Sequence, residues 1–386
     1  IHQPKDEAMK PVVIAGYKRS PFHFAHKGQL VKKRPDDLAA AVVRGLIESS
    51  DVDPAGIEDL IMGCAFPEGE QGLNIARLVG LLSDLPVSVA GVTVNRFCGS
   101  SMQSIHMAAG AIQMNAGEAF VCAGVESMSR VPMGGYNPMP NADLYEQNEG
   151  AYMAMGETAE NLAQKYQIPR DEQERLAVSS HAKATAAREE GRFAGEIVAI
   201  DCNGETVDQD SCIRPGTNAE ALAGLEPAFD ADGTVTAGTS SPLTDGASAV
   251  LVCTEDFASN NNLDVLASIK SIAVAGCQPE IMGYGPVVSS AKALERAGIS
   301  MADIDVIELN EAFAVQALAC ARELSIDLDK MNLDGGALAL GHPLGATGAR
   351  ITGKAAQLLK REGKRYALAT QCIGGGQGIS TVLEAA

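Results

Sequence analysis

The chain has 386 residues, more than one hydrophobic core comfortably serves, so two or three domains are expected. Hydrophobic residues make up 46% and charged residues 20%, which is the composition of an ordinary globular protein. The formal net charge of −19 argues against nucleic acid or an anionic membrane surface as a partner, although a small polyanion can still bind where basic residues gather.

The nine cysteines are scattered along the chain without a paired C-x-x-C spacing. This spacing indicates neither a metal site nor a disulfide framework, and it favours a reducing compartment. No apolar run approaches the length of a membrane span, the N-terminus lacks an export signal, and the C-terminus is not a peroxisomal signal. We therefore expect a cytoplasmic protein of bacterial type without membrane insertion, with an organelle matrix as the alternative location.

The first part of the chain alternates strand and helix patterns. Residues 11–16 have the pattern of a short buried strand, and residues 35–47 that of a helix with acidic residues in its first turn. Residues 53–66 and 119–124 add further strand patterns. This alternation predicts an α/β protein with a largely parallel sheet.

Cys98 lies where a strand pattern changes into a helix pattern. Residues 87–94 alternate as in a buried strand, and Gly99 then opens a helix that continues to Ile112. Backbone N–H groups at such a helix start favour a thiolate, which is the nucleophilic form of cysteine. A cysteine at a turn is more often a bystander than a catalyst, so the rest of the chain has to supply a base and an acid.

The stretch 128–243 differs in character from its flanks. It holds helix patterns from Thr158 and over residues 170–188, followed by loop-rich sequence. It is interpreted both as an insertion that stabilises the fold and as a lid or binding region for a large substrate, two roles that are compatible.

The second half of the chain repeats the first. Residues 301–313 align with residues 54–66 without a gap, and residues 344–351 align with 98–105. A small-residue helix and an apolar strand follow in each half, the second strand being residues 366–370. These matches predict two copies of one α/β unit, which commonly place a site at their interface.

The repeat brings further polar residues to the expected interface. His342 lies on a glycine-rich turn that corresponds to the Cys98 turn, which makes it a candidate base, or else a turn histidine that the nearby backbone satisfies. Cys372 precedes three glycines whose backbone N–H groups can approach an oxyanion closely. Asn310 ends the repeated strand, as a loop cap or as part of a site.

Together these segments resemble the thiolase family over nearly the whole chain. The matching segments, in family order, are residues 95–100, 238–247, 310–313, 341–345 and 372–378. The resemblance implies a thiolase-like α/β fold, in which two repeated half-domains stack in layers (α-β-α-β-α) and carry an inserted loop domain. It assigns residues 1–127 to the N-terminal half, completed by about 244–262, residues 128–243 to the loop domain and residues 263–386 to the C-terminal half. A homodimer or homotetramer is also implied.

The resemblance also assigns chemical roles. Cys98 would be the acylated nucleophile and His342 the base that deprotonates it. Cys372 would protonate the departing acetyl-CoA carbanion, whose enolate form His342 and a water held by Asn310 would stabilise. The backbone N–H groups of Cys98 and Gly374 would hold the oxyanion of the tetrahedral intermediate. Two thiols with such different tasks need different environments.

Coenzyme A (CoA) is implied as a co-substrate, with no permanently bound cofactor. The match places Ser241 beside the pantetheine, Met155 along its channel and Arg214 near the adenine end. An arginine can stack on a purine and offset phosphate charge. The alternative for Arg214 is a solvated loop arginine.

Two residues bear on the substrate. Ser101 stands where acetoacetyl-specific members of the family usually carry glycine, and Ala154 stands where they often carry histidine. A small residue at 154 leaves room for a longer acyl chain. The resemblance therefore implies a 3-ketoacyl-CoA thiolase of fatty-acid β-oxidation, with 3-ketoacyl-CoA and CoA as substrates and a hydratase/dehydrogenase subunit as a candidate partner.

Three alternatives are weighed against this interpretation. A biosynthetic acetoacetyl-CoA thiolase would condense two acetyl-CoA molecules and act on the four-carbon substrate alone. A ketoacyl synthase shares the fold and nucleophile, but Cys372 argues against it. A non-catalytic CoA- or lipid-binding protein would tolerate loss of Cys98, His342 or Cys372, and all three are present.

Overall fold

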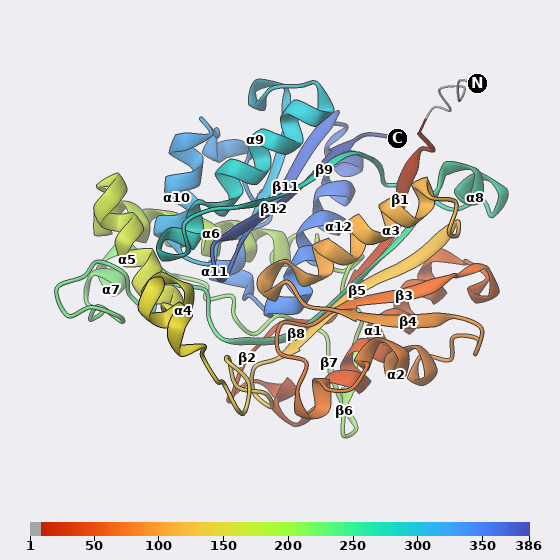
Figure 1. Ribbon diagram of the computed structural model, residues 1–386, viewed down its shortest axis with the longest axis horizontal. Coiled ribbons are helices and arrows are strands. Elements are labelled where there is room, and N and C mark those ends of the chain that lie inside the picture. Colours follow the sequence, from red (N-terminus) through yellow and green to blue (C-terminus); the bar gives the residue numbers. More distant parts are fainter. Residues whose placement is uncertain (1–8) are drawn as a thin grey trace.

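The computed structural model describes residues 9–386, and its main sheet has ten strands (Figure 1). The strand order is β10-β11-β12-β9-β1-β8-β5-β3-β4, with β2 pairing with β8 off this path. The strands are, in chain order, β1 (Val12–Arg19), β2 (His23–Phe24), β3 (Asp59–Gly63), β4 (Ala90–Val94), β5 (Ala119–Ser127), β8 (Thr244–Thr254), β9 (Ala267–Gly276), β10 (Val306–Leu309), β11 (Tyr366–Ile373) and β12 (Gln377–Glu384).

The sheet is mixed, and the prediction of a largely parallel sheet was wrong. Strand β3 pairs in parallel with β4 and β5, and β10 pairs in parallel with β11. The other pairings are antiparallel, because β8 inserts between β1 and β5 and because β11 and β12 form a hairpin. Only two residue pairs, Val13 with Ser268 and Ile14 with Ala267, join β1 to β9. The sheet therefore consists of two similar halves with a short connection.

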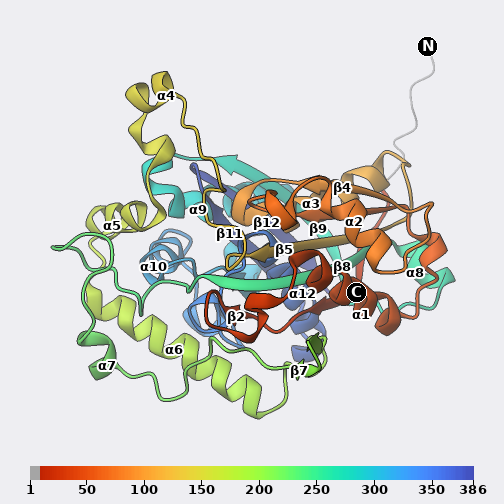
Figure 2. The same cartoon turned by 90° about the horizontal axis from the view of Figure 1, so that it is seen from below.

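Helices form three layers around the two halves (Figures 1 and 2). The outer helices on the N-terminal half are α1 (Pro35–Ser50) and α2 (Ile75–Leu82), and those on the C-terminal half are α9 (Gly285–Ala297) and α10 (Ala314–Glu323). Helices α3 (Ser100–Gln113) and α12 (Leu344–Glu362) lie between the halves and contact strands of both. Each helical layer has its own cluster of buried apolar side chains. Two short helices, α8 (Glu255–Asn260) and α11 (Ala337–Leu340), complete this part.

Glycines let the two middle helices approach to backbone contact. A Cβ added at Gly348 of α12 would lie 2.3 Å from the backbone nitrogen of Met102 in α3, and one added at Gly124 of β5 would lie 2.1 Å from the carbonyl oxygen of Gly345. Real Cβ atoms do not approach so closely, so no larger residue fits at either position. This contact places the start of α3, which follows Cys98, beside the start of α12, which follows His342.

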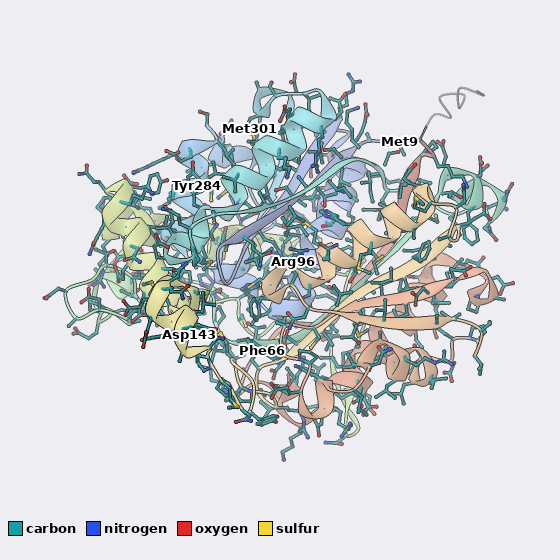
Figure 3. All side chains as sticks on the ribbon, viewed as in Figure 1. Met9, Phe66, Arg96, Asp143, Tyr284 and Met301 are labelled. Carbon is teal, nitrogen blue, oxygen red and sulfur yellow. The ribbon has the colours of Figure 1, made fainter. Side chains whose placement is uncertain are left out.

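The stretch between the halves has its own elements. It contains α4 (Ala142–Gln147), α5 (Met155–Tyr166), α6 (Arg170–Glu189), α7 (Ala219–Ala223) and a small sheet of β6 (Ile200–Cys202) and β7 (Glu205–Val207). Helices α5 and α6 agree with the two helix patterns predicted there. Helix α4, which carries Asp143, projects away from the body of the molecule (Figures 2 and 3). The predicted domain boundaries stay a prediction.

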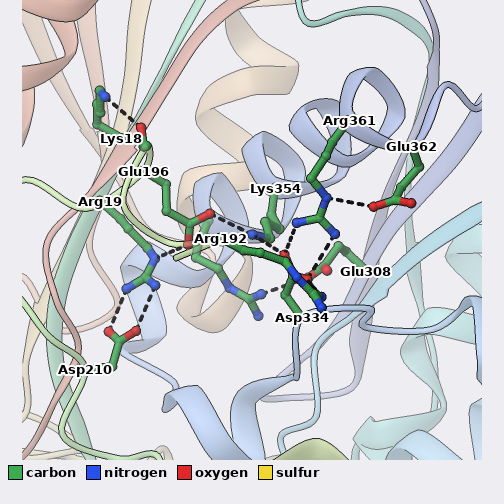
Figure 4. A network of polar contacts seen from close by, with 12 residues as sticks. Lys18, Arg19, Arg192, Glu196, Asp210, Glu308, Asp334, Lys354, Arg361 and Glu362 are labelled. Atoms are coloured by element: carbon green, nitrogen blue, oxygen red, sulfur yellow. Dashed lines mark hydrogen bonds and ion pairs between the residues drawn. The ribbon is translucent and has the colours of Figure 1, made fainter. Parts of the chain in front are cut away.

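A buried network of ion pairs connects distant parts of the chain (Figure 4). Lys354 of α12 pairs with Glu196 at 2.8 Å and with Asp334 at 2.7 Å. Arg19 of β1 pairs with the same Glu196 at 2.7 Å and with Asp210 at 2.7 Å. All five side chains are almost completely buried. The network joins the first strand, the inserted stretch and the second half.

One strand lies differently from the prediction. Residues 87–94 were expected to form a buried strand, but within residues 9–386 β4 is an edge strand that pairs only with β3, and Val87 is 77% exposed. Among the residues described, no helix combines the length and apolar character needed to cross a bilayer. The expectation about an N-terminal export signal falls in part on residues 1–8, which lie outside the described residues.

Candidate active site

Cys98 lies on a tight 3-10 turn, Phe97–Gly99, between β4 and α3. Phe97 has φ +42°, a left-handed conformation that non-glycine residues rarely adopt unless neighbouring contacts enforce it. The Phe97 backbone N–H donates to the Asn95 side-chain oxygen at 2.9 Å, and the Ser100 hydroxyl donates to the Phe97 carbonyl at 2.6 Å. The turn is therefore held in the strained shape that presents Cys98 at the mouth of the helix, where it was predicted.

The two backbone groups expected to hold the oxyanion act on the sulfur of Cys98. The backbone N–H groups of Gly374 and of Cys98 itself donate to this sulfur and lower its pKa. Burial raises the pKa more strongly, the charge of Glu126 adds to that effect, and the pKa of Cys98 lies at about 11. The backbone dipoles thus favour the thiolate, as expected, but loss of hydration has the larger effect on the pKa of Cys98 in the unliganded site.

His342 is buried and held by hydrogen bonds on both ring nitrogens. Its Nδ1 lies 2.6 Å from the hydroxyl of Thr347, which itself donates to the Pro343 carbonyl at 3.2 Å. The hydroxyl therefore accepts from Nδ1–H, which leaves the lone pair on Nε2, 3.3 Å from the side-chain nitrogen of Asn310. Burial and the charge of Arg350 lower the pKa of His342 to about 3. The imidazole is thus neutral, and Nε2, which accepts from the Asn310 side-chain nitrogen, is the basic nitrogen of the ring.

Cys372 lies at the end of β11, before the hairpin loop of residues 374–376. Its side chain is fully buried, and burial together with the nearby Cys98 sulfur raises the pKa of Cys372 well above its ordinary value. Gln371 donates from its side-chain nitrogen to the Cys98 carbonyl, which ties β11 to the Cys98 turn. The second thiol therefore stays protonated, as a proton donor must.

The described contacts join the catalytic candidates through both halves of the molecule. The Phe97–Gly99 turn packs against α12, and Cys98 shares an apolar cluster with Leu344, the first residue of that helix. Asn310 follows β10 and contacts His342 directly, and its Oδ1 is buried without a hydrogen-bond partner in the described part of the chain. Buried oxygens of this kind normally accept from a water or a ligand.

Two of the predicted CoA contacts lie beside this cluster. A Cβ added at Gly374 would be 3.5 Å from the sulfur of Met155, so the Met155 side chain covers the 374–376 loop. The backbone N–H of Ser241 donates to the carbonyl of Ala312 at 3.0 Å, next to the segment that carries Asn310. Met155 and Ser241 therefore lie close to segments that carry catalytic candidates, while their contact with CoA stays a prediction.

Arg214 lies elsewhere. It is exposed, and its guanidinium carbon is 5.1 Å from the centre of the Phe24 ring. Its backbone N–H donates to Nδ1 of His181 at 3.1 Å. These contacts connect Arg214 to no catalytic candidate, so its predicted role at the adenine end stays a prediction.

The two residues used to infer the substrate have different surroundings. Ser101 is fully buried, and its hydroxyl accepts from the backbone N–H of Ala349 at 2.8 Å, between the two middle helices. Ala154 is exposed and precedes Met155 at the start of α5. Ser101 thus acts in helix packing, and the argument about acyl-chain length depends on Ala154 alone.

Sequence reasoning missed four residues that hold the site. Thr347 and Gln371 fix His342 and Cys98 as described above, and the hydroxyl of Thr244 accepts from the His342 backbone N–H at 3.0 Å. Thr244 and Thr347 stand inside or beside the matched segments, but nothing in a single sequence shows their contacts. Glu126 could have been identified from the sequence, because an acidic residue in the mostly apolar strand β5 is buried only where other groups hydrogen-bond or pair with it.

Comparison with known proteins gives a consistent result. Residues 12–256 match the profile of "Thiolase, N-terminal domain" and residues 263–385 that of "Thiolase, C-terminal domain". The 3-ketoacyl-CoA thiolases of Bacillus subtilis and Shewanella loihica are 45% and 49% identical to this chain, covering 97% and 98% of it and 100% of their own length.

Solved structures agree with the sequence comparison. Human mitochondrial 3-ketoacyl-CoA thiolase in complex with CoA superposes with a TM-score of 0.90 at 38% identity, over 98% of each chain. Bacillus anthracis acetyl-CoA acetyltransferase has the same TM-score and identity, over 99% of this chain and 100% of its own. The fold expected from the sequence, an α/β thiolase fold, is confirmed, and the chain belongs to the thiolase family.

Proposed function

We propose that the protein cleaves 3-ketoacyl-CoA with CoA, giving acetyl-CoA and an acyl-CoA shortened by one acetyl unit, in fatty-acid β-oxidation. Full-length relatives named 3-ketoacyl-CoA thiolase support this activity. The observation that carries the chemistry is the surroundings of Cys98: two backbone N–H groups face its sulfur, while a neutral imidazole and a second buried thiol belong to the same site. Nucleophile, base and acid are then all present.

In the first half of the reaction, Cys98 attacks the 3-keto carbon and its thiol proton passes to Nε2 of His342. The backbone N–H groups of Cys98 and Gly374 hold the resulting oxyanion, a contribution of a few kcal/mol in sites of this type. The bond between the second and third carbons then breaks, which leaves the acyl group on Cys98. The departing acetyl-CoA carbanion takes its proton from Cys372, and a water held by Oδ1 of Asn310 stabilises its enolate oxygen.

In the second half, the sulfur of CoA attacks the acyl group on Cys98. The proton of the CoA thiol restores Cys372, and Cys98 leaves as a thiolate that recovers its proton from His342. The atoms balance, and every group returns to its starting state. Proton transfer accompanies the attack of Cys98 on an electrophile, because the high pKa of Cys98 and the low pKa of His342 keep the resting pair neutral.

CoA is bound as a co-substrate in this proposal. The contact of Met155 with the 374–376 loop supports a place for Met155 along the pantetheine channel, and the bond of Ser241 to Ala312, close to Asn310, supports a place for Ser241 beside the pantetheine. Arg214 is solvent-exposed beside an aromatic ring, which suits contact with the adenine end of CoA. The many bacterial relatives favour the cytoplasm as the location.

A homodimer is the proposed assembly. The edge strand β4 leaves one side of its backbone unpaired, a side that natural proteins normally cover. Leu78, Leu81 and Leu82 of the adjacent α2 and Val87 before β4 are exposed. Sedimentation velocity tests the dimer by the mass of the particle, and we expect β4 to pair with its copy in the second chain. The hydratase/dehydrogenase subunit and a tetramer stay predictions.

The deciding experiment compares CoA-dependent cleavage of acetoacetyl-CoA and of a long-chain 3-ketoacyl-CoA. We expect both to be cleaved by the wild type and neither by the Cys98→Ala variant. Cleavage of the four-carbon substrate alone would assign the biosynthetic activity and refute the argument from Ala154. Absence of cleavage with both substrates would refute the proposed function.

A further inference from the structure

Glu126 is a buried carboxylate at the end of β5 that none of the roles above uses. Its side chain is 1% exposed, and among residues 9–386 it forms no ion pair. A buried charge without a cation persists only where several hydrogen-bond donors replace its hydration. The donors around Glu126 show what the carboxylate holds in place.

Four N–H groups donate to the two oxygens of Glu126. Oε2 accepts from the backbone N–H groups of Ala65 at 2.8 Å and Gly345 at 2.9 Å. Oε1 accepts from the backbone N–H of Phe66 at 3.2 Å and from the side-chain nitrogen of Gln71 at 2.8 Å. Ala65 and Phe66 follow β3 in the first half of the chain, whereas Gly345 belongs to the first turn of α12 in the second half. One carboxylate thus fastens the two halves together.

The fastened segments form the walls around the nucleophile. Ala65 and Leu344 belong to the same apolar cluster as Cys98, and Phe66 packs on it. The rings of Phe66 and Phe97 lie 5.9 Å apart, and Phe66 is seen in Figure 3 close to the junction of the two halves. The bond to Gly345 holds the helix turn that directly follows His342.

We infer that Glu126 is a positioning residue for the proposed thiolysis, holding the turn that carries His342 in register with the turn that carries Cys98. The proposal extends the proposed function to a residue that contacts neither substrate nor the reacting atoms. Its physical basis is that one rigid acceptor satisfies at once the donors of residues 65–66, which pack beside Cys98 and Phe97, and the donor of the turn that follows His342. The carboxylate lies at the start of α12, where a negative charge is favourable. A proton acceptor misplaced by a fraction of an ångström loses much of its effect.

The sign of the effect separates positioning from simple electrostatics. The charge of Glu126 opposes ionisation of Cys98, so removal of the charge alone would lower the pKa of Cys98 and speed its alkylation. Displacement of His342 has the opposite effect, because the thiol then loses its proton acceptor and remains in an apolar setting. A variant that removes the charge of Glu126 and also loosens the placement of the His342 turn relative to the Cys98 turn reveals which effect dominates.

The test is Glu126→Gln. Each oxygen of Glu126 accepts from two N–H groups. In glutamine, an –NH2 group replaces one of these oxygens in either orientation of the amide, so it faces two donors and both of those hydrogen bonds are lost. We expect kcat for 3-ketoacyl-CoA cleavage to fall about tenfold or more with KM nearly unchanged. Alkylation of Cys98 by iodoacetamide at neutral pH should slow about fivefold, with its pH profile moved upward.

Asp305→Asn is the matched control. Asp305 also accepts two backbone N–H groups, from Arg365 at 3.0 Å and Tyr366 at 3.1 Å, but it lies at the opposite ends of β10 and β11. We expect this variant to keep the wild-type kcat and alkylation rate. Gln71→Met removes one donor to Glu126 while keeping the shape of the side chain. This variant should lower kcat and the alkylation rate of Cys98 to a smaller extent, and it replaces Glu126→Gln in the test if that variant does not fold.

Three outcomes would overturn the inference: faster alkylation of Cys98 in Glu126→Gln, an unchanged kcat, or equal losses in Asp305→Asn. Because alkylation needs no CoA substrate, its rate decides the role of Glu126 even if the wild type cleaves no 3-ketoacyl-CoA. That result would refute the proposed function separately.

Discussion

Replacement of Lys354 by methionine tests how much the buried network of Figure 4 contributes to stability. The Lys354 side chain is 3% exposed and bridges Glu196 at 2.8 Å and Asp334 at 2.7 Å. Loss of one partner from a buried ion pair costs about 3–5 kcal/mol, because the remaining charge keeps its desolvation cost. Glu196 retains Arg19 and Asp334 retains Arg192, so we expect the lower end of that range, about 3 kcal/mol.

Arg361→Met is the control for this estimate. Arg361 pairs with the same Asp334, but its side chain is 31% exposed, so its loss should cost less than about 1 kcal/mol. Urea unfolding of both variants, followed by circular dichroism at neutral pH, measures the difference in the free energy of unfolding. Equal midpoints for Lys354→Met and Arg361→Met would refute the reasoning that burial sets the magnitude.

The same network predicts a pH dependence with a definite sign. The surrounding cations hold the pKa of Asp334 and that of Glu196 below their ordinary values, although burial alone would raise both. A carboxyl with a lowered pKa stabilises the fold above its unfolded pKa, and this contribution is lost as the pH falls through the folded value. The stability difference between wild type and Lys354→Met should therefore shrink in acid. A difference that grows as the pH falls would contradict this assignment.

Two further predictions concern the middle helices and the base. Gly348→Ala should destabilise the protein by at least about 2 kcal/mol, because the new Cβ meets the Met102 backbone. Gly110→Ala in α3 has open space around the new Cβ and should stabilise the protein by about 0.5–1 kcal/mol. Thermal unfolding measures both changes, and equal effects would contradict the packing argument. Thr347→Val removes the hydrogen-bond partner of His342 Nδ1 and should lower kcat about tenfold without changing the circular dichroism spectrum. An unchanged kcat would show that this hydrogen bond does not set the tautomer of His342.

The element types were largely predictable from the sequence because their signals are local. The acidic first turn of α1, the small-residue start of α3 and the two helix patterns of the inserted stretch all give elements at the expected places. Sheet pairing was not predictable in the same way. Strand β8 is buried throughout and enters the sheet between β1 and β5 from far along the chain. No local pattern shows whether it lies parallel or antiparallel to its neighbours.

The site was predictable in its reacting groups but not in its electrostatics. Cys98 and His342 stand on turns that the internal repeat relates, and Cys372 precedes a separate glycine-rich loop, so these residue types and their settings were visible. The protonation state of Cys98 was not, because burial by the other half of the molecule outweighs the local helix start. For the same reason the tautomer of His342 depends on Thr347 and Asn310, which only the folded chain brings to it.

The shared layer formed by α3 and α12 has a consequence for folding. Each of these helices packs on strands of both halves, so neither half alone can cover the apolar surface that the other provides. A half made separately would expose that surface to water and to aggregation. We therefore expect the catalytic turns to acquire their geometry only when the two halves dock, so that recovery of activity during refolding reports this long-range step rather than any local part of the fold.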